Sequence, residues 1–275
     1  MLSSLCRNFG VSRQAYYKHA EQRVRTWFQV EIVVQLVSEI RIRQPRIGGK
    51  KLYHMLRDDF KSLEFKLGRD KFLVVLQAER LLISPRKRRQ KTTDSSHEQP
   101  VYPNLIKGKK LYRPYQAVAA DITYIRLEEG FCFLSLITDL VSRVILGWCL
   151  SESLDASGPI HALKQARLQM GGLKGCVHHS DRGVQYCSID YVSLLFRYKM
   201  PISMTDVGAP EQNAIAERVN GILKTELLLD ATFKNFKTAS LAASDAIQIY
   251  NYERPHYSLD LLTPMQFLKA NQRKK

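Results

Sequence analysis

Long apolar stretches are absent from the 275-residue sequence. No run reaches the ~18 apolar residues that a membrane-spanning helix needs. The start of the chain lacks the apolar block and small-residue cleavage site of a signal peptide. We therefore expect a cytoplasmic protein with no membrane partner. Hydrophobic residues make up 45% of the chain, enough for a substantial buried core.

Paired cysteines are also lacking. The five cysteines are odd in number, widely spaced, and contain no C-x-x-C pair, so neither a disulfide framework nor a zinc cluster is indicated. We expect reduced, mostly buried thiols at Cys6, Cys132, Cys149, Cys176 and Cys187.

Acidic residues are scarce in the first part of the chain. Residues 1–116 contain 25 Lys and Arg but only 10 Asp and Glu, whereas residues 117–275 contain 17 and 16. A basic block joined to a balanced block is typical of a DNA-binding module on a catalytic domain, because phosphate neutralisation dominates sequence-independent affinity. A basic surface that only confers solubility is the alternative.

Helical patterns fill this basic part. Residues 3–19 predict a short helix, a turn at Gly10 and a second helix capped by Ser12, which is a partial helix-turn-helix within residues 1–22. Residues 23–86 predict a three-helix DNA-binding domain, with helices at 26–42, 47–60 and 67–82. Its last helix begins with a basic turn, and we expect that turn to face phosphates through Arg69 and Lys71.

Prolines and polar residues then break the helical pattern, which predicts a basic linker at 87–116. A run at its start would bind any polyanion or serve as a solvated tether, and comprises Arg86, Lys87, Arg88 and Arg89.

The periodicity changes at residue 117. Three β-rich runs separated by short turns predict an antiparallel meander at 118–127, 131–140 and 143–150. Helices and short strands then alternate at 155–170, 175–181, 188–199, 201–204, 211–228 and 238–252. This order predicts an α/β fold, a mixed sheet with helices on its faces, over residues 117–275.

Three carboxylates stand out in this region. Asp121 lies inside the first strand, where a purely structural strand would carry an apolar residue, and Asp181 directly follows the fourth. Glu217 lies in the second turn of the expected 211–228 helix. If these elements are neighbours, the acids repel one another unless cations neutralise them, and oxygen ligands favour Mg²⁺ or Mn²⁺. Two such ions about 4 Å apart support phosphoryl transfer. Lys224 falls on the same helical face as Glu217 and could touch a phosphate, or be one more exposed lysine.

Other polar residues compete with these. His178 and His179 could bind metal or move protons, although one of two adjacent strand residues should point into the core. Asp139 ends a strand before a turn, which favours a capping role. Tyr124 and Tyr186 are interpreted as packing residues or DNA contacts rather than nucleophiles.

Several longer motifs follow one another in the sequence: DITYI from Asp121, HSDRGVQY from His179, GAPEQNAIAE from Gly208, LKTE from Leu223, YNYERPH from Tyr250, and Thr263-Pro264. In this fixed order they resemble the orfB-type transposases of insertion sequence family three, which are relatives of retroviral integrases. The resemblance runs from the first helix-turn-helix to near the C-terminus.

The resemblance implies a ribonuclease-H-like catalytic core behind a small all-α helix-turn-helix region, with Asp121, Asp181 and Glu217 as a DDE triad holding two Mg²⁺ or Mn²⁺ ions. It implies a DNA transposase that cleaves and transfers strands at the terminal inverted repeats of an insertion sequence, forms a circular intermediate and inserts it into target DNA. It further implies a homo-oligomer on DNA, nucleoid association when bound, an upstream orfA product as fusion or partner, and a DNA contact at Asn213.

One position departs from the family pattern. The family usually has an acid before the Asn of its Pro-x-Asp-Asn-Ala block, whereas this chain has Gln212 before Asn213, with the acid displaced to Glu211. This departure affects a loop contact rather than the triad. The zinc-binding His-His-Cys-Cys module of retroviral integrases is also absent from the sequence.

Two alternatives remain at this point. One is a non-catalytic DNA-binding protein derived from a transposase, and the other is a ribonuclease-H-type nuclease acting on RNA–DNA hybrids. The intact triad argues against the first, because a protein under no catalytic demand would have been free to lose one acid. Joining of DNA ends would separate a transposase from the second.

Overall fold

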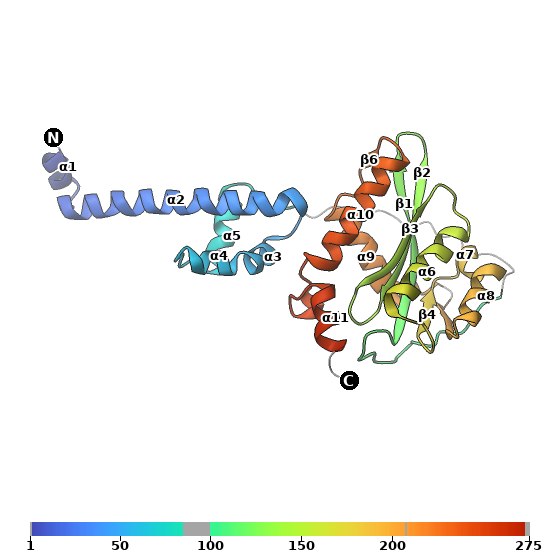
Figure 1. The fold of residues 1–275 in the computed structure, drawn as a ribbon. Helices are drawn as coiled ribbons and strands as arrows, with labels where there is room; N and C mark the ends of the chain where they lie inside the picture. Colours follow the sequence, from blue (N-terminus) through green and yellow to red (C-terminus); the bar gives the residue numbers. More distant parts are fainter. Residues whose placement is uncertain (1, 85–99, 207, 273–275) are drawn as a thin grey trace. The chain divides into compact units, whose positions relative to one another are not determined.

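The computed structural model describes residues 2–84, 100–206 and 208–272, and the chain divides into two compact units, Met1–Ser84 and Pro85–Lys275 (Figure 1). The expected polyanion-binding run from Arg86 to Arg89 lies outside the described residues. Within the described part, no helix combines the length and apolar character needed to cross a membrane.

The first unit is all helical. It contains α1 (Leu2–Asn8), α2 (Arg13–Arg43), α3 (Gly49–Met55), α4 (Arg57–Ser62) and α5 (Arg69–Ala78). Gly10 takes a positive φ of 67° in the predicted turn, and the Ser12 side chain caps α2 by accepting a hydrogen bond from the Ala15 N–H. The expectation of a separate helix at 26–42 is wrong. The 31 residues of α2 form one helix, since no Gly or Pro interrupts them.

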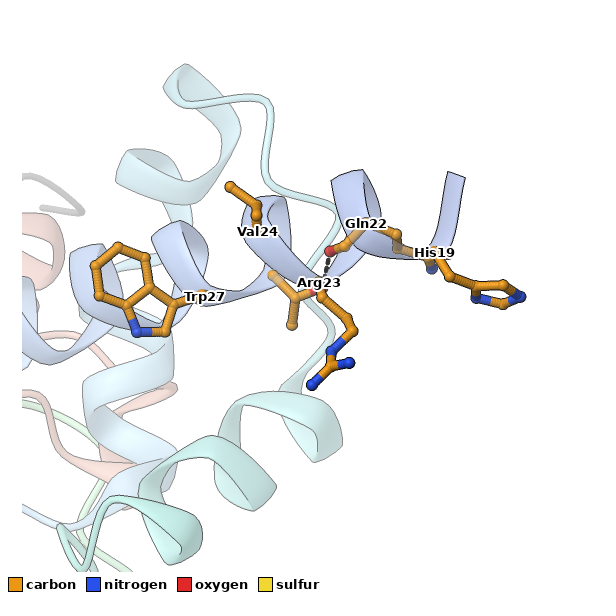
Figure 2. Close-up of a pocket in the computed structure, with 6 residues that line it drawn as sticks. His19, Gln22, Arg23, Val24 and Trp27 are labelled. Atoms are coloured by element: carbon orange, nitrogen blue, oxygen red, sulfur yellow. Dashed lines mark hydrogen bonds between the residues drawn. The ribbon is translucent and has the colours of Figure 1, made fainter. Parts of the chain in front are cut away.

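Only the C-terminal half of α2 packs against α3, α4 and α5. Val33 and Val37 join the buried cluster around Leu52 and Phe72. The N-terminal half leaves large apolar side chains in solvent, and a shallow hollow there is lined by His19, Gln22, Arg23, Val24, Thr26 and Trp27 (Figure 2). Packing therefore stabilises α2 mainly at one end.

The second unit is built on a mixed sheet. Its strands are β1 (Ala117–Leu127), β2 (Phe131–Asp139), β3 (Ile145–Ser151), β4 (Val177–Ser180), β5 (Ile202–Met204) and β6 (Thr232–Phe233). They lie in the order β3-β2-β1-β4-β5, and β6 pairs with β1. The pairs β1–β2 and β2–β3 are antiparallel, while β1–β4 and β4–β5 are parallel. The predicted meander and mixed sheet are confirmed.

Helices cover both faces of this sheet (Figure 1). Helices α6 (Ser157–Met170) and α8 (Ile189–Arg197) bury one face, and α9 (Ala214–Thr225) and α10 (Phe236–Tyr252) bury the other. Both layers form because the central strands carry apolar residues on both sides, as the burial of Val118, Ala119 and Ala120 shows.

Four further helical elements differ from the prediction. The helix predicted at 188–199 is preceded by a separate turn, α7 (Val184–Cys187), and the helix predicted at 211–228 begins as η1 (Pro210–Asn213). As a result, Glu217 lies in the first turn of α9 rather than the second. The remaining two, η2 (Tyr257–Leu259) and α11 (Pro264–Gln272), were not predicted.

A buried ion pair fixes the end of α9. The Arg254 guanidinium, 2% exposed, donates two hydrogen bonds of 2.8 Å to the carboxylate of Glu226, the C-cap residue of α9. A planar guanidinium bound in this bidentate way fixes direction as well as distance. The helix that carries Glu217 is therefore held at its far end by the segment that follows α10.

Candidate active site

Two of the predicted acids are brought together by parallel strands. The last paired residues of β1 and β4 are Ala119 and His179. Asp121 lies two residues further along β1, and Asp181 lies two residues beyond His179, just past the end of β4. Asp181 leaves the end of β4, and one of its carboxylate oxygens accepts a hydrogen bond of 3.0 Å from the Gly183 N–H. The pairing of β1 and β4, two inner strands of the sheet, thus places Asp121 and Asp181 side by side at the carboxyl end of β4.

Helix α9 brings the third acid to the same place. Its Asn220 donates a hydrogen bond of 2.6 Å to Asp121 Oδ2. Glu217 lies one turn before Asn220, on the same helical face. The Asn213 side chain, at the start of α9, donates to the Ala120 carbonyl at 3.4 Å. Two amide contacts therefore hold α9 against the part of β1 that carries Asp121.

The electrostatics of Asp121 show that the three acids are neighbours. Its pKa is raised from 3.8 to about 7, first because the carboxyl is poorly solvated, then because the negative charges of Asp181 and Glu217 lie close by. The hydrogen bond from Asn220 acts in the opposite direction. Burial also raises the pKa of Tyr186, with further contributions from Asp121 and Asp181. A site of this kind favours a bound cation.

The donor set fits a hard divalent cation. Carboxylate oxygens alone favour Mg²⁺ or Mn²⁺ over zinc. Among residues 2–84, 100–206 and 208–272, however, no three His, Cys, Asp or Glu side chains already stand at ligand spacing around one point. The three carboxylates are therefore close enough for their charges to interact, but they do not form a preformed set of metal ligands.

Competing polar residues have structural roles. Asp139 is fully buried and accepts hydrogen bonds from the backbone N–H groups of Tyr115, Val141 and Ser142, which confirms the capping interpretation. The expectation that one of His178 and His179 points into the core is confirmed, and the second is buried as well. Both are buried, because this strand is covered on both faces.

Hydrogen bonds account for these two histidines. His178 Nε2 bonds to the Tyr191 hydroxyl at 2.8 Å, and His179 Nδ1 bonds to the Ser203 hydroxyl at 2.9 Å. Burial lowers the pKa of His178 to about 3 and also lowers that of His179. Both rings are therefore neutral near pH 7, which suits packing better than proton transfer.

The expected DNA contacts lie in different surroundings. Lys224 is half-buried in the last turn of α9, and Arg69 and Lys71 are exposed at the start of α5, where Arg69 pairs with Asp70 at 3.0 Å. Asn213 is only 5% exposed, and its side chain faces β1. Its observed contact is with the protein backbone.

Asn220 was missed by the sequence analysis. It is 7% exposed and is the side chain in direct contact with Asp121. The helical spacing could have revealed it, because Asn220 lies three residues after Glu217 and four before Lys224, so all three share one face.

Family models support this architecture. Two models described as integrase core domains match residues 112–210 and 198–264. Together they cover the sheet, the three acids and α9, so the catalytic core of the chain is an integrase core.

Curated relatives match over nearly the whole chain. A 31 kDa protein of insertion element IS600 from Shigella sonnei is 31% identical over 268 residues, which covers 96% of this chain and 97% of that protein. Transposase InsF for insertion sequence IS3A from Escherichia coli K12 is 28% identical over 278 residues, covering 98% of this chain and 94% of that protein.

A solved structure supports the fold. An intasome of simian T-cell lymphotropic virus, determined with a regulatory subunit of PP2A, superposes with a TM-score of 0.50 at 18% identity, covering 80% of this chain and 74% of that one. The ribonuclease-H-like expectation is thereby confirmed, and neither the non-catalytic alternative nor the hybrid nuclease is favoured. The chain belongs to the IS3 family of insertion-sequence transposases, enzymes of DNA transposition built on an integrase core.

Proposed function

We propose that Asp121, Asp181 and Glu217 are the catalytic triad of this transposase and that they hold two Mg²⁺ or Mn²⁺ ions. The observation that carries the proposal is the pKa of Asp121, raised to about 7 with contributions from the charges of the other two acids. Three anions in a partly buried site repel one another, and divalent cations would relieve that repulsion by drawing the carboxylates together.

The reaction is phosphoryl transfer at the ends of the insertion sequence. Asp121, Asp181 and Glu217 would hold two divalent cations, which would supply activation of a water or a 3′-hydroxyl and stabilisation of the leaving oxygen. The chain's own contribution is positioning: Asn220 orients the Asp121 carboxylate, and the Gly183 N–H orients that of Asp181. Cleavage frees a 3′-hydroxyl that attacks a second phosphodiester, so no covalent protein intermediate is required.

DNA contacts would come from both units. Lys224 lies about two turns after Glu217 on the same face of α9 and would contact a phosphate or terminal base. Arg69 and Lys71 would bind phosphates from α5, with Arg86, Lys87, Arg88 and Arg89 adding charge. This assignment treats 1–22 and 23–86 as DNA-binding segments, 87–116 as linker and 117–275 as catalytic core.

Assembly would occur on DNA. The structurally similar viral chain comes from an intasome, and by analogy we propose that several copies of this chain bind terminal inverted repeats and target DNA together. An upstream orfA product, as fusion or partner, would complete end recognition.

An oligonucleotide assay tests the triad. The purified chain is incubated with Mg²⁺ and a duplex carrying the end of its own insertion sequence, and joined products are resolved on a denaturing gel. Asp121→Asn, Asp181→Asn and Glu217→Gln should each reduce joining by at least ~10³-fold, because positioned carboxylates are lost, while DNA affinity changes little.

A matched control is Glu129→Gln, which removes an exposed acid in the β1–β2 turn and should join DNA as well as the unmodified chain. Circular dichroism shows whether each variant is folded. Joining by a folded triad variant, or cleavage of RNA–DNA hybrids without any joining of DNA, would contradict the proposal.

A further inference from the structure

A short segment ahead of β1 is fastened to the loop that leads into α9. This segment, residues 104–107, is called the strap. The loop runs from Asp206 to Gln212, of which residue 207 is not described. Nearly 100 residues separate the strap from the loop in sequence, so their contacts arise only in the folded chain.

Gln212 lies at the centre of these contacts. Its Oε1 accepts hydrogen bonds from the Asn104 side chain at 2.6 Å and from the Asp206 N–H at 2.7 Å. Its Nε2 donates to Asp206 Oδ2 at 2.9 Å. One carboxamide therefore joins the strap to both ends of the loop, using its acceptor and its donor at once.

Further contacts hold the strap in place. The Lys107 ammonium bonds to Asp206 Oδ2 at 2.7 Å, and the Leu105 N–H donates to the Ser203 hydroxyl at 2.9 Å. Ile106 packs against a buried cluster that includes Ala216, with Ile215 beside it. Ala216 directly precedes Glu217, so the cluster against which the strap packs includes the turn of α9 that carries this acid.

We propose that Gln212 is a positioning residue for Glu217, because it clasps the strap to the Asp206 loop and so fixes where α9 begins. Glu217 is only five residues beyond Gln212 and lies in the first turn of α9, whose position depends on the preceding chain. Displacement of a catalytic group by about 1 Å can cost about 100-fold in rate. This inference rests on the proposed role of Glu217.

The chemistry of the clasp accounts for an amide at this position. A glutamate here could still accept from Asn104 and from the Asp206 N–H, but its carboxylate could not donate to Asp206 and would repel it. Gln212, the departure from the family pattern, and Asp206 are therefore a matched pair in this chain. An asparagine at 206 could donate to a glutamate at 212, which should restore this contact. The ion pair of Lys107 with Asp206 would be lost, but both side chains are exposed, so its loss should cost little.

The test uses the full chain with Gln212→Glu, Asp206→Asn and the double variant. Hydrogen–deuterium exchange of peptides covering the strap and residues 206–217 is measured without DNA, and joining of an insertion-sequence end duplex is measured with Mg²⁺. Gln212→Glu should speed exchange in both peptides and slow joining at least ~10-fold without weakening DNA binding. The double variant should recover to within ~3-fold, whereas a loss of general packing would not be rescued.

Two results would overturn the inference: unchanged exchange and joining in Gln212→Glu, or no recovery in the double variant. Glu217→Gln, assayed in parallel, separates this inference from the proposed function. If Glu217→Gln joins DNA normally, the catalytic assignment fails, whereas the exchange data still report on the clasp. If Glu217→Gln is inactive and Gln212→Glu behaves like the unmodified chain, only the clasp fails.

Discussion

The metal-free fold disfavours the ionised form of Asp121, whose pKa is raised to about 7. It lies on the central strand, receives one hydrogen bond from Asn220, and has two further acids nearby. A purely structural position would carry an apolar residue here, as Ala119 and Ala120 do just before it. An acid at this position agrees with a role in binding cations.

The stability of the metal-free protein should depend on pH through Asp121. The pKa of Asp121 is 3.8 in the unfolded reference and about 7 in the folded chain. The folded state thus binds this proton more tightly, so stability should fall as the pH rises from about 4 to about 7 and stay low above it. Asp121→Asn should remove this dependence and stabilise the chain at pH 8 by on the order of 2 kcal/mol. Thermal melts in EDTA at pH 5 and pH 8 measure this effect.

Addition of Mg²⁺ provides the control for that prediction. The unmodified chain should melt at a higher temperature with Mg²⁺ at pH 8, because a bound cation offsets the repulsion among the three acids. Asp121→Asn should respond less. An identical response from both proteins would show that the cation binds elsewhere.

Individual site residues differ in how far sequence could predict them. Asp121 and Asp181 were predictable because each departs from its local pattern. Asp121 is an acid inside an apolar strand, and Asp181 is an acid directly after one. Asn213, expected to contact DNA, is buried against Ala120, and that depends on how α9 packs on β1. Burial of both His178 and His179 likewise depends on helices covering both faces of the strand.

Among the elements, β3 and α6 approach more closely than side chains would allow. A Cβ on Gly147 would lie 2.0 Å from the Ala162 carbonyl oxygen and 2.7 Å from the Ala166 nitrogen, both on α6. Because these are backbone atoms, no side-chain rotation could make room. The packing of α6 on the sheet therefore requires glycine at this position.

Gly147→Ala should accordingly destabilise the chain by about 3 kcal/mol, at the upper end of the usual cost of overpacking. The matched control is Gly221→Ala in α9, where a Cβ meets nothing within 4 Å and the backbone is helical. That substitution should stabilise by ~0.5–1 kcal/mol, because alanine favours the helix. Urea titrations give both values, and equal effects at the two glycines would contradict the packing account.

The strands were better predicted than the helix ends. Alternating β-branched and aromatic residues, bounded by turns, marked β1, β2 and β3. Helix α2 was divided wrongly around residues 22–23, although nothing from Arg13 to Arg43 stops a helix. The sequence contained a signal for the start of α11. The Thr263 hydroxyl accepts from the Gln266 N–H at 3.2 Å, and the Gln266 side chain accepts from the Thr263 N–H at 2.9 Å, which forms a capping box. Pro264 occupies the first helical position, where proline is favoured.

For the whole molecule, the separation of charge predicts different roles for the two parts of the chain. Residues 1–116 carry most of the excess positive charge, whereas residues 117–275 are nearly balanced and contain the acids. Nonspecific affinity for DNA should therefore come mainly from the first part, and the chemistry from the second. The composition predicts this division, but it could not predict the strap or its contacts with the Asp206 loop.

Salt dependence tests that division. Replacing Arg69 and Lys71 with glutamine should reduce the slope of log affinity against log salt by about 1.8, since each phosphate contact contributes about 0.9. Replacing Lys234 and Lys237, exposed lysines of the second unit, should leave the slope unchanged. Fluorescence anisotropy at ~50–300 mM salt, a range that spans strong and weak binding, gives the slopes. Equal slopes for both pairs would show that α5 does not contact phosphates.

The most direct measurement of the central claim is a junction PCR for circular insertion-sequence DNA in cells that carry the gene with its flanking ends. The unmodified chain and the control Glu129→Gln should both produce circles, and Glu217→Gln should produce none. Circles from Glu217→Gln would contradict a carboxylate-dependent transposase, and so would their absence from the unmodified chain supplied with its upstream partner.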